Sequence, residues 1–148
     1  MAFKINVSEK SGKTYKLETE AEGLIDKELH EKVDGKLVSP DLEGYELEIT
    51  GASDKSGFTV MKEVEGIGRK KILLNYGKGM HKRPKREGKK KQSNPTPKGL
   101  RLRKTVRGKV ISSELSQINL KVIKAGKKSL EDIFNPKTEA PAEQPEAQ

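Results

Sequence analysis

Cysteine and tryptophan are both absent from this chain of 148 residues. Without cysteine the protein has no disulfide, no thiolate metal ligand and no thiol nucleophile, which is typical of a protein of the reducing cytoplasm. Aromatic residues make up 4% of the sequence and hydrophobic residues 31%, so the core that they can build is small. We therefore expect a compact region shorter than the whole chain, with other segments that become ordered only on a partner.

Long apolar runs are also missing. Ile72, Leu73 and Leu74 form a run of three residues, which is far too short to cross a membrane. The N-terminal residues alternate between polar and apolar, unlike the continuous apolar stretch of a signal peptide. The sequence predicts neither membrane insertion nor export.

Positive charge is abundant and is concentrated in one segment. The whole chain has a formal net charge of +9, but the segment from Arg69 to Lys109 contains seventeen lysines and arginines against one acid, Glu87. That segment has a balance of +16, so the rest of the chain, with fourteen basic and twenty-one acidic residues, carries −7. Because such a segment repels itself without a counter-charge, it indicates a surface that binds a polyanion.

Short segments of alternating polarity indicate β-strands. Phe3, Ile5 and Val7 alternate with polar residues, and Tyr15 and Leu17 resume the same period after a turn, which predicts a β-hairpin. Strand length and β-branched or aliphatic content predict further strands over 45–50, 58–61, 69–76, 105–111 and 118–123. We therefore expect a mainly β fold, in the form of a small β-barrel-like or sandwich domain.

Helices and loops are expected in fewer places. Apolar residues about four apart over 24–33, followed by Gly35, predict one short amphipathic helix. Ser129 and Asp132 form a capping pattern that predicts a short C-terminal helix over 129–134. The composition predicts a single β-rich domain over residues 1–76 and 105–135, a long basic loop or arm over 77–104, and a disordered acidic tail over 136–148.

Four motifs follow one another along the chain: ITGASDKSGF at 49–58, RKKILL at 69–74, RKTVRG at 103–108 and INLKVIKAGKKSLEDIF at 118–134. In these residues the chain resembles the family of small-subunit ribosomal protein six of archaea and eukaryotes, over residues 1–135. The resemblance implies a mainly β, non-enzymatic protein of the small ribosomal subunit, associated with the ribosome in the cytoplasm. The implied partners are small-subunit rRNA and neighbouring ribosomal proteins. Because the chain ends in an acidic tail and not in a long basic helix, it is similar to the shorter archaeal form.

The basic segment contains the candidate RNA-binding residues. Tyr76 is its only aromatic residue, so base stacking cannot be the main mode of binding, and we expect contacts to phosphates and riboses of folded RNA. The candidates are Arg69, Lys82, Arg83, Lys85, Arg86, Lys89, Lys90, Lys91, Arg101, Arg103, Lys104 and Arg107. In the loop motif, the residues that carry the family resemblance are Gly51, Asp54, Gly57 and Phe58.

Other kinds of site have little support in the sequence. The loop at 51–57 places a Lys–Ser pair near glycines, but Asp54 stands where a phosphate-binding loop requires glycine. His30 and His81 lack metal-ligand spacing, and no cysteine can complete a zinc site. We expect no catalytic residue, metal, cofactor or small-molecule substrate. The alternative to a structural ribosomal component is a transient ribosome-assembly or translation factor that binds rRNA.

Overall fold

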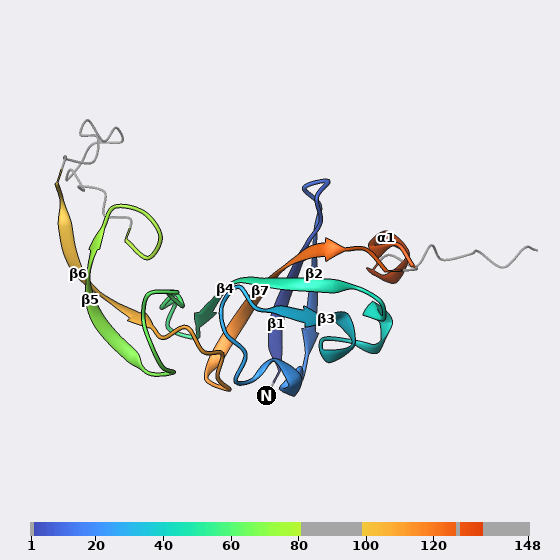
Figure 1. The fold of residues 1–148 in the computed structure, drawn as a ribbon, viewed down its shortest axis with the longest axis horizontal. Helices are drawn as coiled ribbons and strands as arrows, with labels where there is room; N and C mark the ends of the chain where they lie inside the picture. The colour runs from blue at the N-terminus through green and yellow to red at the C-terminus, as the bar shows by residue number, and fades with distance from the viewer. Residues whose placement is uncertain (1, 81–98, 127, 135–148) are drawn as a thin grey trace, which may run out of the picture.

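The computed structural model describes residues 2–80, 99–126 and 128–134. Most of the arm expected over 77–104 and the whole tail expected over 136–148 lie outside the described residues. The described chain is mainly β, as expected, and consists of two separate sheets (Figure 1).

The body of the molecule is a five-stranded sheet with the order β2-β1-β7-β4-β3. Its strands are β1 (Phe3–Ser8), β2 (Thr14–Thr19), β3 (Lys32–Asp34), β4 (Glu46–Asp54) and β7 (Leu115–Lys124). β1 and β2 form the predicted hairpin, β7 runs parallel to β1, and β4 pairs antiparallel with β7. Strands from the two ends of the described chain therefore lie side by side at the centre of the sheet.

Alternation along the strands supplies the main core. β1 buries Phe3, Ile5 and Val7, none of which is more than 2% exposed, while the residues between them lie nearer the surface. Fully burying one such side chain contributes about 1.5–3 kcal/mol. Leu24 and Leu42, both fully buried, complete this core from the connections between strands. These connections contain three short 3-10 turns: η1 (Glu22–Leu24), η2 (Gly35–Leu37) and η3 (Pro40–Leu42).

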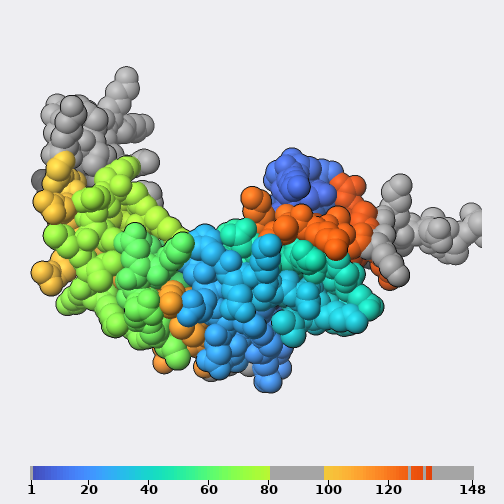
Figure 2. Space-filling view, in the orientation of Figure 1, coloured from blue at the N-terminus to red at the C-terminus, as the bar shows by residue number. Residues whose placement is uncertain are grey.

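The second sheet, which we call the ribbon, consists of the antiparallel strands β5 (Arg69–Asn75) and β6 (Arg101–Arg107). The ribbon extends from one end of the body, and Figure 2 shows it as a lobe continuous with the body. It has its own small apolar cluster, in which Met61, Leu74 and Val106 are buried. Because this cluster is separate from the main core, contacts at the base of the ribbon must fix its orientation.

The barrel-like form of the expected β-domain is wrong. Within the described part of the chain, β2 and β3 are the two edges of the five-stranded sheet, and no strand joins them. The ribbon does not form a second layer over that sheet, because its apolar cluster is separate from the main core.

Two strand boundaries also differ from the sequence prediction. The strand expected over 58–61 is reduced to two isolated bridges, between Ser53 and Thr59 and between Val60 and Arg107. The strand expected over 105–111 is β6, which begins at Arg101 and ends at Arg107. Residues 101–104, which were expected in the arm, therefore belong to the ribbon.

The amphipathic helix expected over 24–33 is wrong. Asp26 and His30 have positive φ angles of 66° and 70°, which a right-handed helix does not allow. The backbone here bonds to a distant segment instead: the amide of Asp26 donates to the carbonyl of Ile111 at 3.0 Å, and the amide of Ile111 donates to the carbonyl of Lys27 at 2.8 Å. Near the C-terminal end, the five-residue helix α1 (Leu130–Phe134) lies within the expected range 129–134.

A close backbone contact at Gly108 leads to a stability prediction. A Cβ atom at Gly108 would lie 1.8 Å from the carbonyl oxygen of Gly66, so alanine would force two backbone segments apart. We expect Gly108→Ala to lower the free energy of unfolding by about 1–3 kcal/mol, the usual cost of overpacking, as measured by urea denaturation. Gly68→Ala is the matched control, because a Cβ there meets no atom within 4 Å. Equal losses in the two variants would contradict this assignment.

Candidate nucleic-acid interface

The register of the ribbon separates its apolar residues from its charges. Residues directly opposite each other in an antiparallel pair lie on the same face. Leu74 opposes Leu102, and Ile72 lies two residues along on the same face of the ribbon. This face packs into the apolar cluster of the ribbon. The other face, which we call the outer face, carries the opposed pairs Arg69 and Arg107, Lys71 and Thr105, Leu73 and Arg103, and Asn75 and Arg101.

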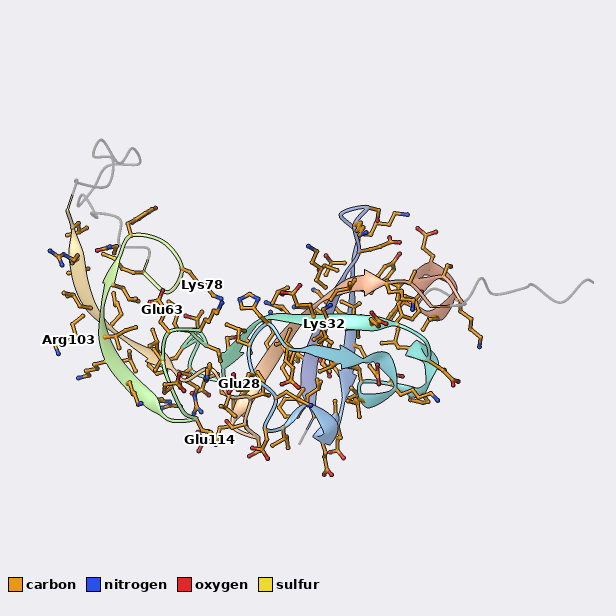
Figure 3. All side chains as sticks on the ribbon, in the orientation of Figure 1. Glu28, Lys32, Glu63, Lys78, Arg103 and Glu114 are labelled. Carbon is orange, nitrogen blue, oxygen red and sulfur yellow. The ribbon has the colours of Figure 1, made fainter. Side chains whose placement is uncertain are left out.

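Basic residues dominate the ribbon. β5 has the sequence RKKILLN and β6 the sequence RLRKTVR, so the two strands contain three and four basic residues and no acid. Figure 3 shows the Arg103 side chain projecting away from the body. Five of these side chains are exposed and Lys104 is half-buried; the exposed ones are Arg69, Lys70, Lys71, Arg101 and Arg103. The like charges on adjacent strands repel one another, which favours a polyanion as the partner of this surface.

Arg107 is the exception among the basic residues that the sequence selected. Its side chain is 2% exposed, and its guanidinium lies inside the junction between the two sheets. The guanidinium donates to the Asp54 carboxylate and also pairs with Glu114. The expectation that Arg107 contacts RNA does not fit this burial, because a charge already bound to two carboxylates is not available to a phosphate.

The carboxylate of Asp54 is the centre of this junction. Arg107 Nε lies 3.1 Å and Arg69 Nε 2.9 Å from the same oxygen, Asp54 Oδ2. The Asp54 side chain is 3% exposed and that of Arg69 is 46% exposed. Burial on its own raises the pKa of Asp54, but the hydrogen bonds from Arg69 and Arg107 outweigh burial and hold the pKa below its ordinary value. The last residue of β4 thus binds the first residue of β5 and the last residue of β6.

The loop motif builds the turn that places Asp54. The amide of Gly57 donates to the carbonyl of Asp54 at 2.8 Å, with Gly57 at a φ of 80° that favours glycine. The amide of Asp54 donates to the carbonyl of Phe58 at 3.0 Å. The guanidinium carbon of Arg69 lies 5.2 Å from the centroid of the Phe58 ring. Gly51 borders an irregularity in the pairing of β4 with β7, where the register shifts between Ile49 and Gly51.

The structure thus brings together five of the sequence-selected basic residues on the ribbon: Arg69, Arg101, Arg103, Lys104 and, at its buried base, Arg107. The other seven, which are Lys82, Arg83, Lys85, Arg86, Lys89, Lys90 and Lys91, lie outside the described residues. The sequence did not reveal the bond between Asp54 and Arg107, because its partners are 53 residues apart and no local pattern connects them.

Metal and membrane sites are absent from the parts that the structure describes. Among residues 2–80, 99–126 and 128–134, no group of three or more histidines and acids could hold a metal ion. No helix in these same ranges has the length and apolar character needed to cross a membrane.

Comparison with known proteins points to one family. The family model described as "Ribosomal protein S6e" matches residues 3–135. A protein of Methanococcus maripaludis named small ribosomal subunit protein eS6 is 42% identical over 127 residues, which cover 85% of this chain and 90% of that protein. The protein of the same name from Archaeoglobus fulgidus is 40% identical over 145 residues, covering 94% of this chain and 100% of the relative. That of Methanocaldococcus jannaschii is 37% identical over 125 residues, 84% of each chain.

The Asp54 junction leads to a prediction on stability and pH. Asp54→Asn leaves the buried charge of Arg107 without one of its carboxylates, and we expect the free energy of unfolding to fall by about 3 kcal/mol at neutral pH. A carboxylate whose pKa is lowered by folding stabilises the protein above its unfolded pKa of about 3.9, and this contribution is lost as the pH falls through the lower folded pKa. The difference between the two proteins should therefore shrink in denaturation measurements below about pH 4.

The control for this variant is Glu18→Gln. The Glu18 side chain is 70% exposed and lies 3.9 Å from Lys4, so its removal should leave the unfolding free energy unchanged. A loss from Asp54→Asn no larger than that of the control, or one that is the same at pH 7 and pH 3, would contradict a buried ionised carboxylate.

Proposed function

The chain belongs to the ribosomal protein S6e family and is a structural constituent of the small ribosomal subunit, within which we propose that the ribbon braces folded rRNA. The observation that carries this proposal is the ribbon itself, two strands with seven basic residues, from three in β5 and four in β6, and no acid. The role is one of binding without catalysis, performed in the cytoplasm beside neighbouring ribosomal proteins.

Ion pairing supports the ribbon as the RNA-binding part. Some exposed lysines of the body have acidic neighbours, such as Lys4 near Glu18 and Lys36, whose Nζ lies 2.7 Å from Glu43 Oε1, although Lys10 and Lys16 have no ion pair within the described ranges. Lys71, Arg101 and Arg103 have no ion pair with any residue in the described ranges. Charges without a local counter-ion are available to phosphates, and each one that binds a phosphate releases condensed cations from the RNA.

The mode of recognition follows from the side chains on the outer face. Arginine and lysine bind phosphate oxygens, and the other two residues of β5 on the outer face, Leu73 and Asn75, are uncharged. No aromatic residue occurs in either strand, so stacking on bases is not the main contribution of this face. We infer that the outer face follows the sugar–phosphate backbone of a folded RNA and reads its shape more than its sequence.

The segment 81–98 extends this proposal on the basis of its sequence. It contains eight lysines and arginines and a single acid, Glu87, and it connects the part of the chain that follows β5 to the part that precedes β6. We propose that its basic residues contact the same RNA as the outer face, including the seven selected from the sequence.

Stoichiometry in the subunit tests the proposed role. A structural constituent should remain at one copy per mature small subunit after a wash at high salt, as measured by quantitative mass spectrometry. A transient assembly or translation factor would be removed by the wash or would occur only on immature particles, and that result would contradict the proposal.

Neutralising the outer face gives a further prediction. Lys71→Gln combined with Arg103→Gln removes two exposed cations. Each phosphate contact on a duplex adds about 0.9 to the slope with which log affinity falls as log salt rises. The slope for small-subunit rRNA should therefore decrease by up to about 1.8 in the double variant. Filter binding over a salt series measures this slope. The thermal midpoint should hardly change, because exposed charges contribute little to folding.

The matched control replaces two exposed lysines of the β1–β2 hairpin, Lys10→Gln and Lys16→Gln. It removes the same charge from the body, and its salt slope should stay close to that of the wild-type protein. Equal slopes for the two double variants would show that net charge, and not the outer face, determines RNA binding.

A further inference from the structure

A cleft at the base of the ribbon borders the outer face, from which Arg103 and Thr105 contribute to its lining. It has a volume of 560 Å³ and lies between β6 and the two loop segments 57–59 and 78–79. The residues used below are Phe58, Thr59, Lys78, Gly79, Lys104 and Thr105, all of which line the cleft. Its volume falls within the range of about 300–1,000 Å³ that is usual for small-ligand sites.

The free edge of β6 forms one wall of the cleft. The amide of Arg107 donates to the carbonyl of Thr59 at 2.9 Å, and the amide of Met61 donates to the carbonyl of Arg107 at 3.1 Å, so the backbone groups of Arg107 point away from β5. Backbone groups two residues apart in a strand point to the same side, so those of Thr105 point toward the cleft. No described backbone group of the segment 57–59 bonds to Thr105. The cleft is therefore a gap in which the pairing begun at Arg107 does not continue.

The chemistry of the cleft suits a nucleotide. Lys78 and Lys104 supply two cations, and neither has an ion pair within the described ranges. Thr59 adds a hydroxyl and Phe58 an aromatic ring, while Gly79 has a φ of 78° and no side chain that would narrow the space. In Figure 3 the Lys78 side chain lies on the inner side of the ribbon, whereas Arg103 points outward. Lys78 and Lys104 thus add two cations to the cleft beside Arg103, which lines it from the outer face.

We propose that this cleft receives one unpaired nucleotide of RNA, with its phosphate bound by Lys78 and Lys104 and its base against Phe58. The proposal rests on the proposed function, because it assigns a specific contact to the RNA that the ribbon binds. Arg69, whose guanidinium carbon lies 5.2 Å from the centre of the Phe58 ring, holds that ring in place. A paired base inside a helix cannot reach a recess of this kind, so the cleft selects a bulged or looped nucleotide.

Two matched RNA hairpins test the proposal. One is fully paired, and the other is identical except for a single-nucleotide bulge. Wild-type protein should bind the bulged hairpin at least about fivefold more tightly, as expected when one base stacks on an aromatic ring. Phe58→Leu, which keeps apolar bulk under Arg69, should remove this preference while leaving the affinity for the paired hairpin unchanged.

Lysine variants separate the cleft from the outer face. Lys78→Gln should reduce the preference for the bulged hairpin, whereas Lys71→Gln, which removes the same charge from the outer face, should weaken binding of both hairpins equally. Thermal melting of each variant identifies any loss that comes from unfolding. Ultraviolet crosslinking of the wild-type protein to the bulged hairpin, followed by mass spectrometry, provides a readout that does not depend on a variant and should place the crosslink at Phe58.

The outcomes distinguish this proposal from the proposed function. Equal, salt-dependent binding of both hairpins by the wild-type protein, with no crosslink at Phe58, would overturn the cleft and leave the outer face in place. Binding of neither hairpin would overturn the proposed function and the cleft with it. Titration of the protein with adenosine monophosphate tests whether the cleft binds a free nucleotide. If the protein bound adenosine monophosphate as tightly as the bulged hairpin, the assignment of the cleft to RNA would be overturned.

Discussion

The bond between the buried carboxylate of Asp54 and the guanidinium of Arg107 joins two sheets that have no strand in common. Asp54 ends β4, a long strand of the five-stranded body, and Arg107 ends β6 of the ribbon. Since the ribbon has its own small apolar cluster, the main core alone cannot fix its direction. A charge pair that is almost fully removed from water has a strongly preferred geometry, because any displacement leaves a buried charge unsatisfied. The direction of the outer face, where we propose that RNA binds, therefore depends on this pair.

Local patterns of period two predicted the strands that are buried on one face. β1, β2 and β4 follow the alternation of Phe3, Ile5 and Val7, of Tyr15 and Leu17, and of the residues from 45 to 50. The same reasoning failed over 24–33, where Leu24, Leu29 and Val33 are buried as expected, but from the turn η1, an irregular segment and the strand β3, and not from an α-helix. Burial there is set by backbone bonds to residues 109–111, and a pairing across some eighty positions leaves no local pattern in the sequence.

The candidate site divides in the same way. The excess of positive charge is a property of composition, and it pointed to a segment that includes both strands of the ribbon. It could not separate Arg103 from Arg107, because both lie on the same face of β6 in the same basic motif. What separates them is their distance from Asp54, which depends on tertiary structure. The role of the loop motif at 49–58 also depends on tertiary structure. Its glycine turn places the Asp54 carboxylate where it binds Arg107 at the base of the ribbon.

The most direct test of this account measures the orientation of the ribbon in the free protein. The chain has no cysteine, so spin labels can be attached at Lys71→Cys on the ribbon and Lys16→Cys on the body without other changes. Double electron–electron resonance measures the distance between the two labels. It should give a single narrow distance distribution for the otherwise wild-type protein and a clearly broader one when Asp54→Asn is added. A distribution that is already broad with Asp54 present, or that Asp54→Asn leaves unchanged, would contradict the claim that this buried charge pair fixes the orientation of the ribbon on the body.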